Sequence, residues 1–249
     1  MENTEDICRL VRRERLRFYI ADLHFYHENL LNDMDHRGFE SLEKMHEYMI
    51  NQWNKRVNKR DEVIVLGDFS MGKPSETTEI LCRLNGKIGL IEGNHDHRYL
   101  DDSKFDKSNF MWITPYKKMK DNKRSVILSH YPIMCYDGQF HKDKDGNPKT
   151  YMLYGHVHDT FDEYLINQFI NETKSLKRPV KKEKDTINTP CQMINCFCMY
   201  SDYVPLTLDE WIKVDTVRRS MIKEEDYKEF ANTVRPDIYM DGIDLTIRT

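Results

Sequence analysis

The stretch LIEGNHDHR, residues 90–98, changes from apolar to reactive within a few positions. It begins inside the apolar run IGLI, residues 88–91, which has the length and composition of a buried strand. It then presents Gly93, an asparagine, two histidines and an aspartate, which are residue types that ligate metals and transfer protons. Such a cluster is either a site or only a polar turn, and the rest of the chain decides between the two.

Other apolar runs end in the same way. They are LRFYIA before Asp22, VIVL before Gly67 and Asp68, VILS before His130, and MLY before Gly155. Between the runs, residues 40–57 carry apolar side chains at three- and four-residue steps with Ser41 as N-cap, and a shorter helix is expected over 75–84. Strands alternating with helices predict an α/β fold, in which ligands bind beyond the carboxyl ends of the strands. Clusters distant in sequence are therefore expected to meet.

These clusters carry the ligand types of a metal site. In chain order they are Asp22-Leu-His24, Gly67-Asp68, GNHD, His130, and His156-Val-His158. Carboxylate, amide and imidazole groups without a thiolate suit manganese, iron or zinc. Each piece alone has an ordinary explanation as an N-cap, a turn or a surface histidine. Because all five follow apolar runs in one chain, their combination predicts a site for two metal ions.

The composition of the chain limits the classes of protein to which it can belong. The chain has 249 residues, of which 39% are hydrophobic, and a net charge of −4, so a real core is expected and a duplex nucleic-acid binder or membrane-surface protein is not. The chain has no apolar run of about 18 residues, and its start is charged where a signal peptide is apolar, which predicts a soluble, cytoplasmic protein. The six cysteines form no CxxC pairs and are expected to be reduced, with a metal or redox cluster of Cys191, Cys196 and Cys198 as the alternative.

Residues 1–249 are expected to form a single domain with additions. The polar segment 136–150 lies between two of the clusters, a place where loops often touch substrate. Residues 161–190 hold a helical pattern and then the basic run KSLKRPVKKEKD, interpreted as a solvated linker with an anion-binding arm as the alternative. A C-terminal extension begins at about residue 206, where TLDEWIKV indicates a helix start.

The series DxH, GD, GNHD, a strand-end histidine and GHxH, from Asp22 to His158, resembles the calcineurin-like metallophosphoesterase superfamily, and further resembles its small bacterial and phage members. The resemblance implies a four-layer αββα sandwich of two mixed β-sheets flanked by helices. It also implies two divalent metal ions, with manganese preferred and iron, zinc or nickel as alternatives. The ligand set it implies is Asp22, His24 and His158 on one metal, Asn94, His130 and His156 on the other, and Asp68 bridging both.

The same resemblance implies hydrolysis of a phosphoester by a hydroxide that bridges the metals. His95 would be the general acid that protonates the leaving oxygen, and Asp96 would accept a hydrogen bond from the other ring nitrogen of His95. We assign substrate binding to His27 and Arg98. A phosphodiester of a small molecule or nucleotide is expected ahead of a phosphomonoester, and the oligomeric state is open.

Two alternatives stay open, and a third class is excluded. A nuclease acting on single-stranded nucleic acid could use residues 174–184 and the aromatics Phe25, Tyr26 and Tyr131 as a groove. A catalytically silent scaffold of the same fold should have lost ligands, whereas the set here is complete. A metallo-β-lactamase-like hydrolase needs HxHxDH, which the chain lacks. The remaining histidines singled out, His36, His46 and His141, are expected to be surface or satisfied side chains.

Overall fold

The computed structural model describes residues 15–179 and 186–222. Parts of several predictions lie outside these residues: the charged start with Cys8, the end of the basic run, and the end of the C-terminal extension.

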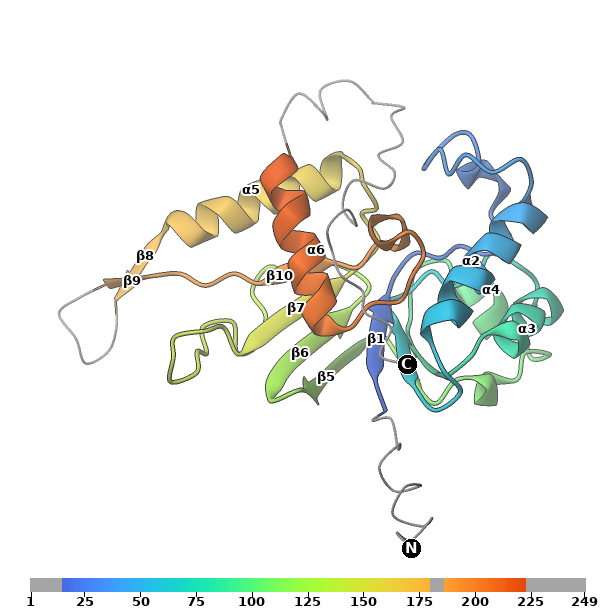
Figure 1. Ribbon diagram of the computed structural model, residues 1–249, viewed down its shortest axis with the longest axis horizontal. Helices are drawn as coiled ribbons and strands as arrows, with labels where there is room; N and C mark the ends of the chain where they lie inside the picture. Colours follow the sequence, from blue (N-terminus) through green and yellow to red (C-terminus); the bar gives the residue numbers. More distant parts are fainter. Residues whose placement is uncertain (1–14, 180–185, 223–249) are drawn as a thin grey trace, which may run out of the picture.

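The first sheet carries the early polar clusters. Its strand order is β1-β2-β3-β4 and all its pairings are parallel. Two helices that follow the predicted patterns connect its strands (Figure 1), and Ser41 caps the first of them by accepting a hydrogen bond from the backbone N of Lys44. The elements are β1 (Arg17–Ile20), η1 (Glu28–Leu30), α2 (Leu42–Arg56), β2 (Glu62–Val65), α3 (Pro74–Arg83), β3 (Lys87–Ile91), α4 (His97–Leu100), η2 (Lys107–Asn109) and β4 (Ile113–Thr114).

The second sheet carries the later clusters. Its order is β10-β7-β6-β5, with β5 antiparallel to β6 and the other pairs parallel. The elements are β5 (Tyr116–Asp121), β6 (Arg124–Ser129), β7 (Thr150–Tyr154), α5 (Phe161–Ser175), β8 (Lys177–Pro179), β9 (Thr186–Asn188), β10 (Met193–Asn195), η3 (Cys198–Ser201) and α6 (Leu208–Met221). This sheet is mixed, as expected, whereas the pairings among β1, β2, β3 and β4 of the first sheet are all parallel.

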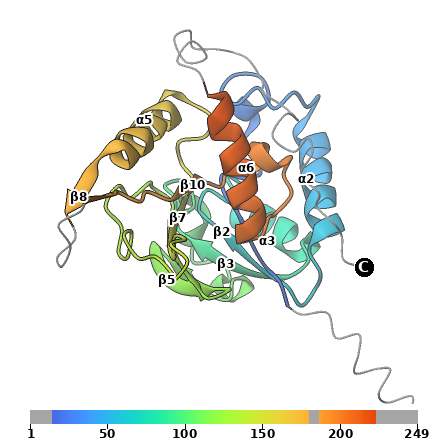
Figure 2. The same ribbon diagram turned by 60° about the vertical axis from the view of Figure 1, so that its left-hand side comes forward.

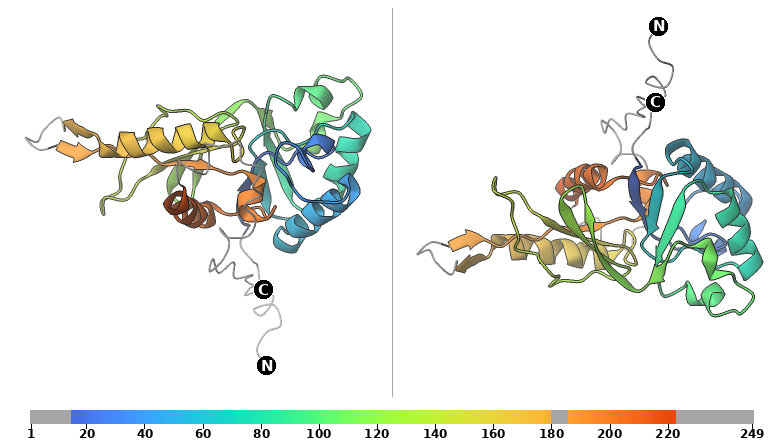
Figure 3. Two further views of the ribbon diagram at one scale, coloured as in Figure 1. Left: turned by 90° about the horizontal axis from the view of Figure 1, so that it is seen from above. Right: turned by 90° about the horizontal axis from the view of Figure 1, so that it is seen from below.

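Side chains of the second sheet alternate between two cores, because successive residues of a strand point to opposite faces. Val126 and Leu128 of β6 belong to the large core shared with the first sheet, and Ile127 between them joins Ile166 and Ile170 of α5 in a smaller one. The two sheets lie between α2 and α3 on one side and α5 and α6 on the other (Figure 3). The predicted α/β fold with helices flanking two sheets is therefore confirmed.

Helix α6 is part of this core. It lies between α5 and α2 (Figure 2), and the indole of Trp211, which is completely buried, donates to the carbonyl of Tyr19 in β1 at 2.8 Å. Leu206 also pairs with Tyr19 in an antiparallel bridge. The segment expected as a C-terminal extension thus completes the edge of the first sheet. None of the described helices has the length and apolarity that a membrane span requires.

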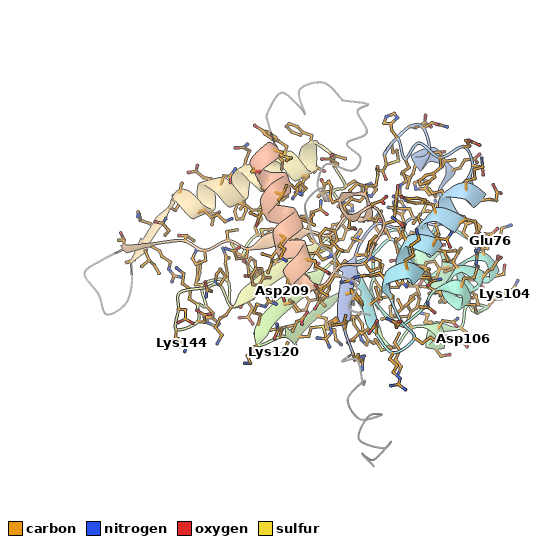
Figure 4. All side chains as sticks on the ribbon, viewed as in Figure 1. Glu76, Lys104, Asp106, Lys120, Lys144 and Asp209 are labelled. Carbon is orange, nitrogen blue, oxygen red and sulfur yellow. The ribbon has the colours of Figure 1, made fainter. Side chains whose placement is uncertain are left out.

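The loop over residues 136–150 does not stay at the strand ends. It returns to Thr150, the first residue of β7, whose five residues span about 16 Å before Gly155. Lys144 accordingly lies at the far lower edge of the molecule (Figure 4). The expectation that this loop touches substrate is wrong for its second half, because that half lies at the amino end of the strand.

Candidate metal centre

The polar clusters meet at the carboxyl ends of the strands. Asp22 follows β1, Asp68 follows β2, Asn94 follows β3, His130 follows β6 and His156 follows β7. Carboxyl ends of parallel strands share one edge of a sheet, and the corresponding edges of the two sheets lie together here. Two groups of ligand atoms result, Asp22 with His24 and His158, and Asp68 with His130 and His156, with the atoms of each group within 4.8 Å of one another.

Asp68 reaches both groups. Its Oδ2 lies 3.5 Å from Nε2 of His24 and 3.4 Å from Nε2 of His130. The amide oxygen of Asn94 lies 3.0 Å from Nε2 of His130 and 2.9 Å from Nδ1 of His156, so Asn94 joins the second group. The structure therefore brings together the seven residues that the sequence singled out as ligands.

The atoms in these groups fit divalent ions. His130 uses Nδ1 for the carbonyl of Leu66 at 2.8 Å, which leaves Nε2 facing Asp68. Nε2 of His24 and Nε2 of His158 face each other at 3.1 Å inside the protein, an arrangement in which a shared cation satisfies both nitrogens. The donor set of carboxylate, amide and imidazole without thiolate is the one that manganese, iron and zinc accept.

The electrostatics favour a positive charge at the same place. Burial lowers the pKa of His130, but its hydrogen bond to Asp68 and the charge of Asp22 outweigh burial and raise the pKa to about 9. Burial also raises the pKa of Asp22, which is completely enclosed. The carboxylates of Asp22 and Asp68 thus favour a positive charge between them. A divalent metal ion would supply more of this charge than a protonated histidine does.

Five of the candidate ligands have strained backbone. Asp22, His24, Asp68, His156 and His158 have φ angles of 56°, 50°, 53°, 71° and 46°. Left-handed backbone at a residue other than glycine costs about 1–3 kcal/mol and persists only where the surroundings enforce it. Such a concentration at the ligands, which lie in loops far apart in sequence, indicates a site whose geometry is maintained at the expense of stability.

Two glycines allow the ligand loops to touch. A Cβ on Gly93 would lie 2.2 Å from Oδ1 of Asp68, and one on Gly155 would lie 2.6 Å from Oδ2 of Asp22. Both distances are shorter than any that side chains tolerate. The glycines of GNHD and GHxH therefore let neighbouring loops pack directly against the two ligand carboxylates.

His95 lies at the mouth of the centre. Its side chain is 34% exposed, its Nε2 is 4.0 Å from Oδ2 of Asp68, and its backbone N donates to Oδ1 of Asp68 at 2.8 Å. Its ring is 5.3 Å from that of His24. Burial lowers the pKa of His95. Its imidazole is accessible from solvent while remaining beside the carboxylate of Asp68.

Asp96 does not orient His95, contrary to the expectation. Its carboxylate is completely buried and accepts from the backbone N of Asp68, Phe69 and Gly93 and from the hydroxyl of Tyr99, at 2.8–2.9 Å. It therefore clamps the GD and GNHD loops together. Burial, with the nearby charge of Asp68, raises the pKa of Asp96 to about 6.

His27 and Arg98 lie on the rim. The ring of His27 is 5.3 Å from that of His24 and 6.1 Å from that of His95, and its Nδ1 is buried without a hydrogen-bond partner. Arg98 is exposed on α4, and its charge contributes to the lowered pKa of His95. His27 therefore lies beside His24 and His95, and Arg98 comes three residues after His95, with its backbone N donating to the carbonyl of His95.

The aromatic groove proposed for a nuclease does not form as expected. Phe25 is 1% exposed and packs in the core, and Tyr26 packs edge-on against His46. Tyr26 is partly exposed, and Tyr131 is the most exposed of the three at 49%, with its ring 4.4 Å from that of His156.

The described part of the basic run is distant from the ligands. It begins in the last turn of α5, a 15-residue helix that starts at Phe161 and extends about 22 Å. Arg178 then lies over the ring of Phe140 at 3.8 Å. These basic side chains therefore do not line the metal centre.

Two buried residues that the sequence analysis did not single out contact the ligands. Oδ1 of Asp35 lies 2.6 Å from Nδ1 of His158, and Arg37 donates to the other oxygen of Asp35. Burial alone would raise the pKa of Asp35, but His158 and Arg37 hold it well below its usual range. The stretch DHR at residues 35–37 has no periodicity and reads as an ordinary polar loop, so only the tertiary structure reveals this contact.

His46, His141 and the cysteines are outside the two groups of candidate ligand atoms, although the thiol of Cys198 donates to the carbonyl of Asp22 at 3.2 Å. His46 is buried and accepts from the backbone N of Tyr26 at 2.9 Å, as expected of a satisfied histidine, while His141 is exposed. The cysteines that the structure describes are all free thiols, and the three at 191, 196 and 198 are buried. No candidate metal group among the described residues includes them.

Comparison with known proteins agrees with this geometry. The model of the family "Calcineurin-like phosphoesterase" matches residues 18–214. The chain is 31% identical over 200 residues to the uncharacterized protein MJ1445 of Methanocaldococcus jannaschii, covering 79% of this chain and 89% of that one. It is 27% identical over 161 residues to the Gene 66 protein of Mycobacterium phage D29, covering 57% of this chain and 77% of that one.

A solved structure supports the fold. The protein of unknown function AQ665 from Aquifex aeolicus matches with a TM-score of 0.52 and 22% identity, covering 81% of this chain and all of that one. At this identity the match supports the fold alone. The family match spans every candidate ligand of the centre, from Asp22 to His158, and on this evidence the chain belongs to the calcineurin-like phosphoesterase family.

Proposed function

We propose that this protein hydrolyses phosphodiesters at a centre of two divalent metal ions. The observation that carries the proposal is the position of Asp68, whose Oδ2 lies within 3.5 Å of a ligand nitrogen in each group. A carboxylate shared in this way suits the bridging position of two-metal hydrolases. Manganese is the ion that we propose first, with iron, zinc and nickel as alternatives. The residues that would hold the two ions are Asp22, His24 and His158 on one side, Asn94, His130 and His156 on the other, and Asp68 between them.

The charges of the ligands favour an anionic substrate. Bound divalent ions supply Lewis acidity and lower the pKa of water. Asp22 and Asp68 are the carboxylates among the proposed ligands, and position 94 is an asparagine, so the ligands neutralise only half of the charge of two such ions. The centre therefore stays positive and stabilises the negative charge that develops on phosphoryl oxygens.

Three side chains on the rim complete the proposal. His95, partly exposed beside Asp68, is positioned to give its proton to the leaving oxygen. His27 and Arg98 would hold the phosphate oxygens that the metals do not contact. Asp96 acts indirectly, because it fixes the two loops that carry Asp68 and His95.

We infer a diester ahead of a monoester from the surroundings of His156. The exposed ring of Tyr131 beside His156 offers a flat surface for a nucleotide base.

The test compares initial rates of the Mn²⁺-loaded protein on bis-p-nitrophenyl phosphate and on p-nitrophenyl phosphate. Asn94→Ala, which removes a ligand, serves as the blank, and Asn147→Ala, in the remote loop, serves as the control. Faster diester cleavage that is lost in Asn94→Ala and kept in Asn147→Ala is the expected result.

Other outcomes identify the alternatives. Faster cleavage of the monoester would overturn the diester assignment. Rates on both esters equal to those of Asn94→Ala, in protein that holds two ions, would favour the scaffold. A single-stranded oligonucleotide cleaved in preference to both esters would favour the nuclease.

A further inference from the structure

Asp35 contacts a metal ligand from outside the ligand set. Its Oδ1 lies 2.6 Å from Nδ1 of His158, and the two side chains are 5% and 9% exposed. An ionised carboxylate can only accept, so His158 donates its Nδ1 proton and presents the lone pair of Nε2 to the centre. That Nε2 lies 3.1 Å from Nε2 of His24 and 3.8 Å from Oδ1 of Asp22. Asp35 thus selects the tautomer of His158 that can bind a metal.

Arg37 holds Asp35 in place. Its Nε and Nη2 both donate to Oδ2 of Asp35, at 3.0 and 2.9 Å, a two-point contact that holds this one oxygen in place. The guanidinium is completely buried, so this pair is shielded from water and salt. Oδ1 is left free to receive His158.

The same guanidinium holds the loop that carries the other ligands of this group. Nη1 donates to the carbonyl of Leu23 at 2.7 Å and Nη2 to that of Asp22 at 2.9 Å. Asp22 and His24 have φ angles of 56° and 50°, which need an external restraint. Through these contacts Arg37 connects Asp22 and His24 with His158, a residue 134 positions away from His24.

The second group has no comparable pair among the described residues. Its His130 donates Nδ1 to the carbonyl of Leu66, and a carbonyl makes an imidazole less basic than a carboxylate does. The two groups are therefore oriented by different means, and removal of the pair should weaken one of them selectively.

We propose that Asp35 and Arg37 are a positioning pair that sets the metal affinity of the group formed by Asp22, His24 and His158. The inference rests on the proposed function, since it concerns the same centre. The group with the pair binds its ion more tightly than the group of Asn94, His130 and His156. Neither residue of the pair touches substrate.

Three variants and one control test the pair. Asp35→Asn keeps the shape of the side chain but loses the charge, Arg37→Lys keeps the charge but loses the two-point contact, and Asp35→Glu restores the carboxylate. Asp61→Asn is the control, because Asp61 is a carboxylate that is 2% exposed and accepts from the backbone N of Leu16 and Asn58 near the opposite end of the first sheet.

The readout is Mn²⁺ binding to the metal-free protein, followed by the electron paramagnetic resonance signal of the free ion. Wild type and Asp61→Asn should each bind two ions, one tightly and one more weakly. In Asp35→Asn and Arg37→Lys the affinity of the tight site should fall about 10–100-fold while the weaker site is unchanged. Asp35→Glu should recover part of that loss.

The outcomes separate the two claims. If wild type binds two ions and Asp35→Asn and Arg37→Lys bind both with wild-type affinity, the positioning role is overturned while the proposed function stands. If both affinities fall equally, and fall in Asp61→Asn as well, the pair is merely structural and the inference is overturned. If wild type takes up no divalent ion, both claims are overturned.

Discussion

Replacing Gly93 with alanine should displace the bridging carboxylate. The added Cβ would stand 2.2 Å from Oδ1 and 2.4 Å from the backbone N of Asp68, and real Cβ atoms do not approach closer than 3.0 Å. The Asp68 loop must therefore retreat by at least about 0.8 Å, whereas metal–ligand distances tolerate about 0.2 Å. A displacement of this size at reacting groups costs about 100-fold in rate.

The assay measures bound Mn²⁺ and the initial rate on bis-p-nitrophenyl phosphate in the same samples. Gly93→Ala should lose at least about 100-fold in rate and bind fewer than two ions. Gly146→Ala is the control, because its Cβ would meet nothing within 4 Å although its φ of +85° is left-handed. It should cost about 1–2 kcal/mol in unfolding free energy and leave metal binding and rate unchanged.

A Gly93→Ala protein that holds two ions and works within about threefold of the wild-type rate would refute the reasoning. It would mean that the Asp68 loop moves without disturbing the centre, and that close packing of the GD and GNHD loops does not set the position of the bridging ligand.

The structure yields three further predictions. His95→Ala should keep both metals and lose most activity on esters with poor leaving groups, since such oxygens need a proton; equal losses across a series of substituted aryl diesters would contradict its role as the acid. Asp96→Ala should lower the free energy of unfolding in urea by about 3–5 kcal/mol, because three backbone N–H groups and the hydroxyl of Tyr99 lose their acceptor; a loss below about 1 kcal/mol would contradict the clamp. Burial lowers the pKa of His46 from 6.5 to about 4. Between these values the unfolded chain binds a proton at His46 and the folded chain does not. The contribution of neutral His46 to the free energy of unfolding is therefore complete above pH 6.5 and falls as the pH decreases towards 4. When the pH is lowered from 7.5 to 5, the free energy of unfolding in urea should fall by about 1–2 kcal/mol more for wild type than for His46→Gln. Equal decreases would contradict the lowered pKa of His46.

The clusters that hold the candidate ligands were predictable because each cluster comes after an apolar run, whereas the division of the ligands between two metals came from the family resemblance. A strand such as IGLI is recognisable from its composition, and its carboxyl end fixes where Asn94 and His95 must lie. The same reasoning places His130 and His156 from the runs before them. Parallel pairing then brings these ends together without further information.

Roles that depend on where side chains point were not predictable. Asp96 stands next to His95 in sequence, yet its carboxylate turns towards the backbone of Asp68 and Phe69. Asp35 and Arg37 lie in a loop without periodicity, and apart from each other their partners are ten or more residues away in the chain, so no local pattern marks them. The direction of the strands also determines where the loop after His130 runs. Because β7 is parallel to β6, this loop must return to the amino end of β7.

The central claim is that two ions act together at this centre. The most direct measurement titrates metal-free protein with Mn²⁺ and follows bound metal and hydrolysis of bis-p-nitrophenyl phosphate in the same samples. Two equivalents should bind, and the rate should rise mainly with the second, because the ligands on both sides of Asp68 must be filled. Full activity after one equivalent, or an equal rate in the metal-free protein, would contradict the account.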